Sequence, residues 1–350
     1  MPIPLTMKLK VLLPLLALPL GAAAQDAKPA TAPKPAPAAA KQAEPAKTAA
    51  EPAKTAAKPA ETKPAATPTP APAKPAEPAK TAEIKKEEPK KAAPPPKPVA
   101  IFKDKALEAA VRKQVFAKRE SQDPLTAEDV ANVAIVEGKD LGITDLTGLE
   151  KCTALASLTL SGNKISQLTP LKGLTRLQFL DLANNQVADL TPLAECKALQ
   201  YLELTRNRVV DVRPLAGIES LTSLYLAGNQ IEDATPLFKL PKVWTLYLEG
   251  NKVSRLDGIS AMKWLSMLSL KGNRISDIQP LESLSDLQFL FLDDNQISDF
   301  TPLHRMWKKD NEGAREWAPY CQIHLKGNPV SDTSKPLLEE LKKEGARLSL

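Results

Sequence analysis

Few residues in this chain have the types and spacing that catalysis or metal binding requires. The 350 residues include only two histidines, His304 and His324. No cysteine or serine has a matching His and Asp/Glu at a recognisable motif spacing, and no glycine-rich phosphate-binding loop is present. The acidic pair Asp181 and Glu203 would supply too few of the roughly six to eight oxygen ligands that Ca²⁺ takes. We therefore expect no catalytic residue, no cofactor and no metal site.

The three cysteines do not suggest a disulfide framework. Cys152 and Cys196 replace a leucine that recurs elsewhere in the repeated segment described below, for example as Leu174 and Leu284. They are two repeats apart, or roughly 10 Å at strand spacing, and a disulfide needs Cα atoms within about 7 Å. We predict that both are small core residues and that Cys321, far from either, stays unpaired.

Residues suited to binding recur every 22 positions. They are the third and fifth residues of the segment LxxLxL, which alternate with leucines and should point away from the core. Six of these 14 positions are aromatic, and only nine other aromatics occur in the chain. The predicted partner-binding residues are Phe179, Tyr201, Tyr225, Tyr247, Met267, Phe289 and Phe291, surrounded by a charged rim of Asp181, Glu203, Arg206, Glu249, Lys271, Asp293 and Asp294.

Aromatic residues also suit strand surfaces for packing alone. Their concentration on one face leads us to favour a binding surface. We expect the ligand to be another protein. The alternatives are a glycan or cell-wall polymer, since sugar rings stack on aromatic side chains, and a structural envelope spacer without a ligand.

A 22-residue segment that occurs seven times must position these residues. Its clearest copy, Leu155–Arg176, is LASLTLSGNKISQLTPLKGLTR, and its asparagine recurs at Asn163, Asn185, Asn207, Asn229, Asn251, Asn273 and Asn295. A period in this range is typical of a solenoid. LxxLxL predicts a short strand, and the asparagine should bond to backbone groups in the turn that follows. Thr-Pro then predicts a tight return by 3₁₀ turns, because proline cannot continue a helix.

The pattern LxxLxLxxNxIxxLxPL resembles the leucine-rich repeat family, in particular the 22-residue bacterial type found in internalins. The resemblance covers about Leu141 to Val330. It implies an α/β solenoid, a horseshoe with short parallel strands on the concave face, a 3₁₀ or irregular convex side, a helical N-cap and a C-terminal capping helix. The fifth copy has Asp257-Gly258-Ile259 in place of Thr-Pro-Leu, which should alter a convex turn only. The wall-anchoring signal common in internalins is not found, so wall attachment is not implied.

The segment before the array is expected to be its cap. Asp104 and Thr126 can each cap a helix N-terminus. Val130, Val133 and Ile135 repeat the spacing of the first leucines of a copy, and residues 141–149 match the second half of one, with three extra residues before them. Within a domain of residues 99–350, we predict an N-terminal cap at 99–140 and repeats at 141–303.

After Asn295 the next asparagine of the series is Asn328, so 11 residues are inserted. The insertion lies within residues 304–319 and contains two tryptophans. Insertions in solenoids often contribute to binding, but we favour a flap whose tryptophans cover the last coils. Residues 320–350 should form the last coil and a C-terminal cap, with a closing helix at Lys335–Lys343 and Leu337, Leu338 and Leu341 inward.

The first 98 residues carry a formal net charge of +8 and residues 99–350 a net −2, so the +6 of the whole chain comes from its N-terminal part. The basic balance is therefore no sign of nucleic-acid binding. Lys8 and Lys10 precede an apolar run at residues 11–20 and then small residues, which predicts a signal peptide at 1–24. The alternative is an uncleaved anchor, although the run is shorter than the roughly 20 residues that span a bilayer.

Residues 25–98 hold 18 of the 33 prolines and almost no large aliphatic residue. Such a composition cannot bury enough apolar area to offset chain entropy, so we predict a disordered linker. Together these features predict an exported protein of the periplasm, cell surface or extracellular space, without a transmembrane span. Its oligomeric state is not indicated.

Overall fold

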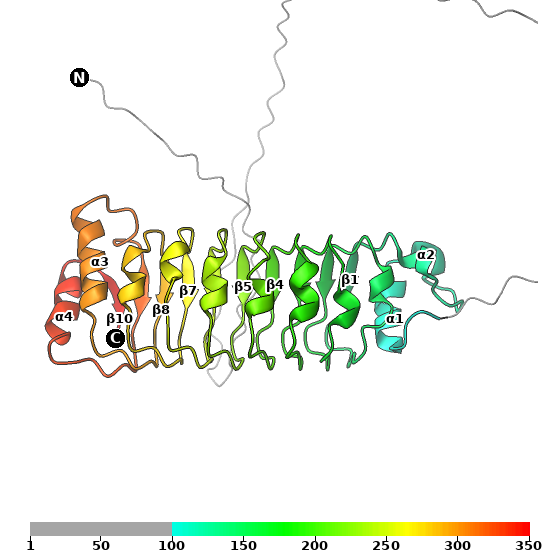
Figure 1. Ribbon diagram of the computed structural model, residues 1–350, viewed down its shortest axis with the longest axis horizontal. Coiled ribbons are helices and arrows are strands. Elements are labelled where there is room, and N and C mark those ends of the chain that lie inside the picture. Colours follow the sequence, from blue (N-terminus) through cyan, green and yellow to red (C-terminus); the bar gives the residue numbers. More distant parts are fainter. Residues whose placement is uncertain (1–99) are drawn as a thin grey trace, which may run out of the picture. The chain divides into compact units, whose positions relative to one another are not determined.

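The computed structural model describes residues 100–350, and the predicted signal peptide (1–24) and linker (25–98) lie outside the described residues. The described part is a stack of coils, each with one short strand on one side and a helical turn on the other (Figure 1). All strands belong to one parallel sheet, and strands that follow one another in sequence are neighbours in it. This arrangement confirms the predicted solenoid.

Ten strands of three residues each form the sheet. They are β1 (Ile135–Glu137), β2 (Ser157–Thr159), β3 (Phe179–Asp181), β4 (Tyr201–Glu203), β5 (Ser223–Tyr225), β6 (Thr245–Tyr247), β7 (Met267–Ser269), β8 (Phe289–Phe291), β9 (Gln322–His324) and β10 (Arg347–Ser349).

The return segments contain 3₁₀ turns, as the Thr-Pro pattern predicts. They are η2 (Leu149–Lys151), η3 (Thr169–Leu171), η4 (Thr191–Glu195), η5 (Arg213–Leu215), η6 (Thr235–Lys239), η7 (Ile259–Ala261) and η8 (Gln279–Ser283), and a further turn, η1 (Phe116–Lys118), lies in the N-terminal cap. In the fifth copy Gly258 has φ 88°, and η7 begins two repeat positions later than η6. The expected local change of the convex turn is therefore confirmed.

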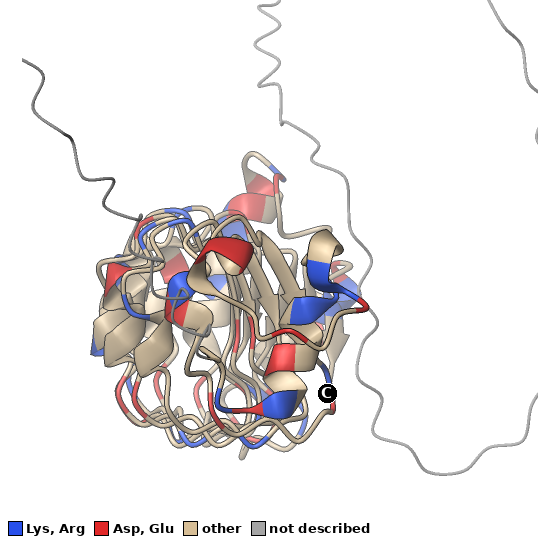
Figure 2. Cartoon of the chain, turned by 90° about the vertical axis from the view of Figure 1, so that its right-hand side faces the viewer, with Lys and Arg blue, Asp and Glu red and all other residues tan. Residues whose placement is uncertain are grey.

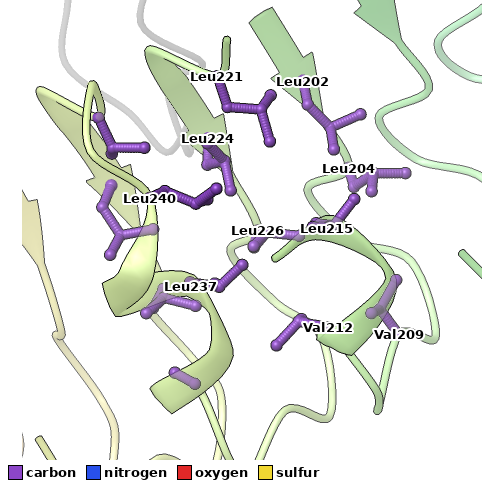
Figure 3. Packing of buried hydrophobic residues seen from close by; sticks show 14 of the residues in the cluster. Leu202, Leu204, Val209, Val212, Leu215, Leu221, Leu224, Leu226, Leu237 and Leu240 are labelled. Atoms are coloured by element: carbon purple, nitrogen blue, oxygen red, sulfur yellow. The ribbon is translucent and has the colours of Figure 1, made fainter. Parts of the chain in front are cut away.

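The core consists of the same inward side chains in every coil. Leu202, Leu204 and Val209 of one coil have no exposed area, and Leu224 and Leu226 of the next belong to the same cluster (Figure 3). Each coil thus buries its leucines against the next, and the end coils need caps to keep theirs dry.

The repeated asparagines join neighbouring coils. Asn229 donates from Nδ2 to the carbonyls of Leu204 and Leu226, both at 2.9 Å, and its Oδ1 accepts from the amide of Val209 at 2.9 Å. Equivalent bonds recur at the other asparagines, from Asn163 to Asn328. Because each side chain satisfies backbone groups of two coils, the predicted ladder is confirmed.

The residue before each of these asparagines has a positive φ. Glycine occupies the position in five coils, for example Gly250 with φ 65°. Asn184, Arg206 and Asp294 adopt φ of 55–56° in three others. The turn therefore requires a left-handed residue, which glycine supplies without steric cost.

Both predicted helix caps at the N-terminus are confirmed. The Asp104 carboxylate accepts from the amides of Ala106 and Leu107 at the start of α1 (Lys105–Arg112), at 2.9 and 3.1 Å. Thr126 forms a capping box with Asp129 at the start of α2 (Ala127–Val130).

The predicted alignment of the first coil was wrong. The sequence pattern matches Val130, Val133 and Ile135 to the leading leucines of a copy and requires three extra residues after them. Strand β1 instead pairs Val136 with Leu158, so the step is 22 residues and no residue is extra. Val133 and Val136 point inward, whereas Ile135 faces outward and is 48% exposed.

This alignment is not obvious in the sequence, because two residues of the first coil depart from the repeat pattern. Gly138 stands where other copies have the last leucine of LxxLxL, and a Cβ there would lie 3.0 Å from Leu160 Cδ2. Leu141 stands at the asparagine position, where its amide donates to Asn163 Oδ1 at 3.1 Å. The backbone of this coil is therefore regular, although the coil lacks the leucine and the asparagine that define the repeat.

The inserted segment packs against the end of the array. Helix α3 (Thr301–Glu312) replaces a 3₁₀ turn, and Trp307 and Trp317 are 1% and 4% exposed. Trp307 Nε1 donates to the carbonyl of Ala318 at 3.0 Å. Since both tryptophans are buried, the packing interpretation of residues 304–319 holds.

Helix α4 (Lys335–Lys343) closes the array, as predicted. Leu338 and Leu341 are buried, but Leu337 is only partly so, because it lies toward the edge of the helix face. Lys308 of α3 forms ion pairs with Glu340 and Glu344 at 3.2 and 2.7 Å, which join the inserted helix to this cap.

Candidate binding face

The concave face of the sheet carries two rows of outward side chains. The parallel register places equivalent residues of neighbouring strands opposite each other. The third row is Ile135, Ser157, Phe179, Tyr201, Ser223, Thr245, Met267, Phe289 and Gln322, and the fifth row is Glu137, Thr159, Asp181, Glu203, Tyr225, Tyr247, Ser269, Phe291 and His324. At a strand spacing of about 4.8 Å, neighbours within a row can touch.

Strands β3 to β6 bring six of these residues together in what we call the aromatic–acidic cluster: Phe179, Asp181, Tyr201, Glu203, Tyr225 and Tyr247. The rings of Phe179 and Tyr201 stack, with centroids 4.3 Å apart and planes at 7°. Tyr225 lies 5.3 Å from Tyr201 and 5.2 Å from Tyr247, the latter edge to face. All four rings are partly exposed, so they form one continuous aromatic surface.

A second aromatic group lies at β8 and β9. Phe289 and Phe291 are parallel with centroids 6.3 Å apart, and His324 stacks on Phe291 at 4.7 Å. Between the two groups, Met267 accepts a hydrogen bond from the Thr245 hydroxyl at 3.7 Å. The predicted aromatic residues are thus brought together in two groups rather than one.

The carboxylates of the aromatic–acidic cluster have no cationic partner within residues 100–350. Glu203 Oε1 accepts from the amide of Thr205 at 2.7 Å, and Asp181 Oδ1 from that of Ala183 at 3.0 Å. Burial raises the pKa of Glu203 to about 7, and the negative charge of Asp181 adds to the rise. Burial also raises the pKa of Tyr201. The centre of the cluster therefore holds a desolvated carboxyl group that is only partly ionised near pH 7 and has no cationic partner to stabilise its charged form.

Only some residues of the predicted charged rim form ion pairs or hydrogen bonds with other side chains. Arg206 is exposed beside the cluster. Lys271 lies 3.8 Å from Asp294, and Glu249 accepts from the Ser269 hydroxyl at 3.0 Å. These residues border the face and can meet solvent or a ligand.

Three residues that the sequence analysis missed also belong near this face. His324 lies four residues before Asn328, as every fifth-row residue lies four before its asparagine, so the pattern could have identified it. Trp244 and Trp264 are 48% and 68% exposed and lie just before β6 and β7. They precede the two rows, so the alternation of a strand gives no signal for them.

The described part shows no metal-binding cluster and no disulfide. Residues 100–350 contain no group of three or more His, Cys, Asp or Glu placed to hold a metal ion. Cys152, Cys196 and Cys321 are buried and unpaired. A shallow depression beside η2 and η3 contains Asp145 and Glu150 but no histidine or cysteine. None of the helices in this part has the length and apolarity to cross a membrane.

The coils, the asparagine ladder and the open concave face define a leucine-rich-repeat solenoid. Family models agree: Leucine Rich repeats (2 copies) match residues 175–217 and 263–303, and a single Leucine Rich repeat matches residues 218–234. The chain belongs to the leucine-rich-repeat family. No curated protein matches the sequence.

Solved structures identify the type of repeat. An internalin C2 from Listeria monocytogenes is 34% identical, with a TM-score of 0.53 over 59% of this chain and 91% of that one. A leucine-rich-repeat protein from Leptospira interrogans is 25% identical, with a TM-score of 0.51 over 58% of this chain and 50% of that one. The repeats are therefore of the bacterial, internalin-like type. This fold is that of a protein-interaction module.

Proposed function

We propose that this protein is exported and binds a partner protein through its concave face, without catalysis. The observation that carries the proposal is the contact of four partly exposed rings from four consecutive coils, with centroids 4.3 to 5.3 Å apart. Core packing does not explain these rings, because the core lies on the opposite side of the sheet. Aromatic residues held in place in this way are typical anchors of protein interfaces.

Export is proposed from the N-terminal sequence. The basic residues Lys8 and Lys10, the apolar run at 11–20 and the small residues after it have the order of a secretory signal. The destination would be the periplasm, the cell surface or the medium.

A glycan ligand is less well supported. Sugar rings bind to an open aromatic face, but Phe179 and Tyr201 each cover one face of the other. The stacked pair therefore offers less open ring face to a flat sugar than two separate rings would, and the neighbouring carboxylates suit a polar protein surface.

Binding assays with the full-length protein would test the proposal, using purified envelope and extracellular proteins and purified glycans as ligands. We expect the double variant Tyr225→Ala/Tyr247→Ala to weaken protein binding by at least about tenfold. The matched control is Ser157→Ala/Thr159→Ala, which alters the same two rows outside the aromatic–acidic cluster. The proposal fails if the tyrosine variant leaves every detected interaction unchanged. Loss of glycan binding alone would favour the glycan alternative.

A further inference from the structure

The aromatic–acidic cluster combines two features that attract a cation. Tyr201 and Tyr225 are partly exposed neighbours, with centroids 5.3 Å apart and ring planes at 41°, and an aromatic ring attracts a cation placed over its face. Glu203 lies two residues after Tyr201 on β4 and directly opposite Tyr225 on β5. On its other side it lies opposite Asp181 of β3. Two carboxylates therefore adjoin two rings within three neighbouring strands.

Between β2 and β9 the charges of the two rows are of one sign, and the next position of the third row, on β10, is Arg347. From β2 to β9 the third and fifth rows contain Asp181 and Glu203 but no lysine or arginine. Lysine and arginine residues of the array lie mainly on the turns and end helices instead (Figure 2). Within these rows, Asp181 and Glu203 form no ion pair although Arg206 borders them, and a ligand that supplies a cation would complement the two carboxylates.

We propose that the aromatic–acidic cluster receives a lysine or arginine side chain of the partner protein, with the cation between the Asp181 and Glu203 carboxylates and against the Tyr201 and Tyr225 rings. This inference rests on the proposed function and specifies the chemistry of the partner. A cation there gains charge-assisted hydrogen bonds and cation–π contacts at once. It also supplies the counter-charge that Asp181 and Glu203 lack.

The protonation behaviour of the cluster supports this assignment. The titratable groups that face Glu203 are Asp181 on β3, Tyr201 on its own strand and Tyr225 on β5. Burial raises the pKa of Tyr201 and Tyr225, so both phenols are neutral near pH 7. A bound cation favours ionised Glu203, so its affinity should fall as the pH drops below about 7.

The tyrosine signals in an NMR spectrum provide a direct assay of cation binding, because the whole chain has only four tyrosines to resolve. Three lie in the cluster, and the fourth, Tyr320, is 61% exposed in the C-terminal segment and serves as an internal reference. Full-length protein labelled with ¹³C in its tyrosine rings would be titrated by NMR with trilysine or triarginine. Triglutamine, triglutamate and chitotriose at equal ionic strength are the control ligands. We expect the cationic peptides to shift the Tyr201 and Tyr225 signals and not that of Tyr320.

The double variant Asp181→Asn/Glu203→Gln keeps the size of both side chains and removes their charge. We expect this variant to bind the cationic peptides at least about tenfold more weakly than the wild type. The control variant Ser157→Ala/Thr159→Ala should bind them with unchanged affinity. Thermal unfolding of each variant, followed by circular dichroism, would verify that it is folded.

Three results would overturn cation recognition: equal shifts with triglutamine, an unchanged affinity in the charge-neutral variant, or no tyrosine shift with either cationic peptide. The concave face would then remain a candidate protein-binding surface, tested independently by the tyrosine double variant. Shifts with chitotriose alone would contradict both proposals and favour a glycan.

Discussion

Phe179 and Tyr201 stack with their ring planes at 7° and their centroids 4.3 Å apart, although 22 residues separate them in sequence. The contact follows from the solenoid, since the register places each residue opposite its equivalent in the next coil. Neighbouring rings hold each other in place before a ligand arrives. The entropy lost on binding is therefore smaller than for four independent flexible side chains.

The asparagine ladder predicts a large loss of stability from one small truncation. Asn229→Ala removes four hydrogen bonds and leaves the carbonyls of Leu204, Leu226 and Ala227 and the amide of Val209 without that partner. We expect the free energy of unfolding to fall by about 3 kcal/mol, as measured by urea unfolding. The control is Gln230→Ala at the exposed next residue, and an equal effect of the two variants would contradict a structural role of the ladder.

The left-handed position before the asparagine predicts a graded series at Gly250. A Cβ there would meet the Cα and N atoms of Gly228 at 3.7 Å, so the cost of a side chain comes from the backbone conformation rather than from a clash. We expect Gly250→Ala to cost about 1 kcal/mol and Gly250→Val more. Gly250→Asn should cost least, because Asn184 occupies the equivalent position. Equal losses for all three would show that the backbone is not the cause.

The sequence was sufficient to predict the fold because the period of 22 determines both the strand and its neighbours. It failed at the first coil, where Gly138 and Leu141 replace the leucine and asparagine that mark the register. The backbone there keeps its path because Leu160 fills the space beside Gly138 and Asn163 reaches back to the Leu141 amide. Such compensation between coils is not visible in a single segment.

The rows of the candidate site were also predictable, since alternation along a strand determines which side chains point outward. The gap between the two aromatic groups was also readable, because the row positions of β7 are Met267 and Ser269, but the stacking of Phe179 on Tyr201 was not. The desolvation of Glu203 likewise depends on the rings beside it, which belong to Tyr201 on the same strand and Tyr225 on the next. These properties require side-chain positions.

The packing of the inserted segment predicts different outcomes for two tryptophans. Trp307 is 1% exposed and donates to the Ala318 carbonyl, whereas Trp264 is 68% exposed. Trp307→Ala should lower the free energy of unfolding by about 3 to 5 kcal/mol. Trp264→Ala should change it by less than about 0.5 kcal/mol. Denaturant unfolding measures both, and a small effect at Trp307 would mean that the flap does not cover the core.

The cysteines should be unreactive in the folded protein. Burial raises the pKa of the thiol to about 12 at Cys152, about 11 at Cys196 and about 12 at Cys321. Since the thiolate is the reactive form, we expect no rapid modification by a thiol reagent near pH 8. All three should react once the protein is unfolded in denaturant without reductant. Fewer than three reactive thiols would reveal a disulfide, and rapid native labelling would contradict their burial.

Glu203 predicts a pH-dependent stability. Its pKa is raised by burial from 4.5 to about 7 in the folded protein. Below about pH 4.5 both the folded and the unfolded state are protonated, so the residue has no effect. As the pH rises from there to about 7, the unfolded state ionises first, and the free energy of unfolding falls. Above that range both states are ionised and the loss is constant.

Removing the carboxylate should remove this loss. We expect Glu203→Gln to unfold like the wild type near pH 4 and to be more stable by on the order of 2 kcal/mol near pH 8. Urea unfolding at both pH values measures the difference. If the free energy of unfolding differs between variant and wild type by the same amount at pH 4 and pH 8, the change comes from packing. If the difference grows with pH, it comes from the desolvated Glu203 carboxylate. The same charge that destabilises the free protein is the one that a cationic partner would neutralise, so stability given up at this site would be recovered on binding.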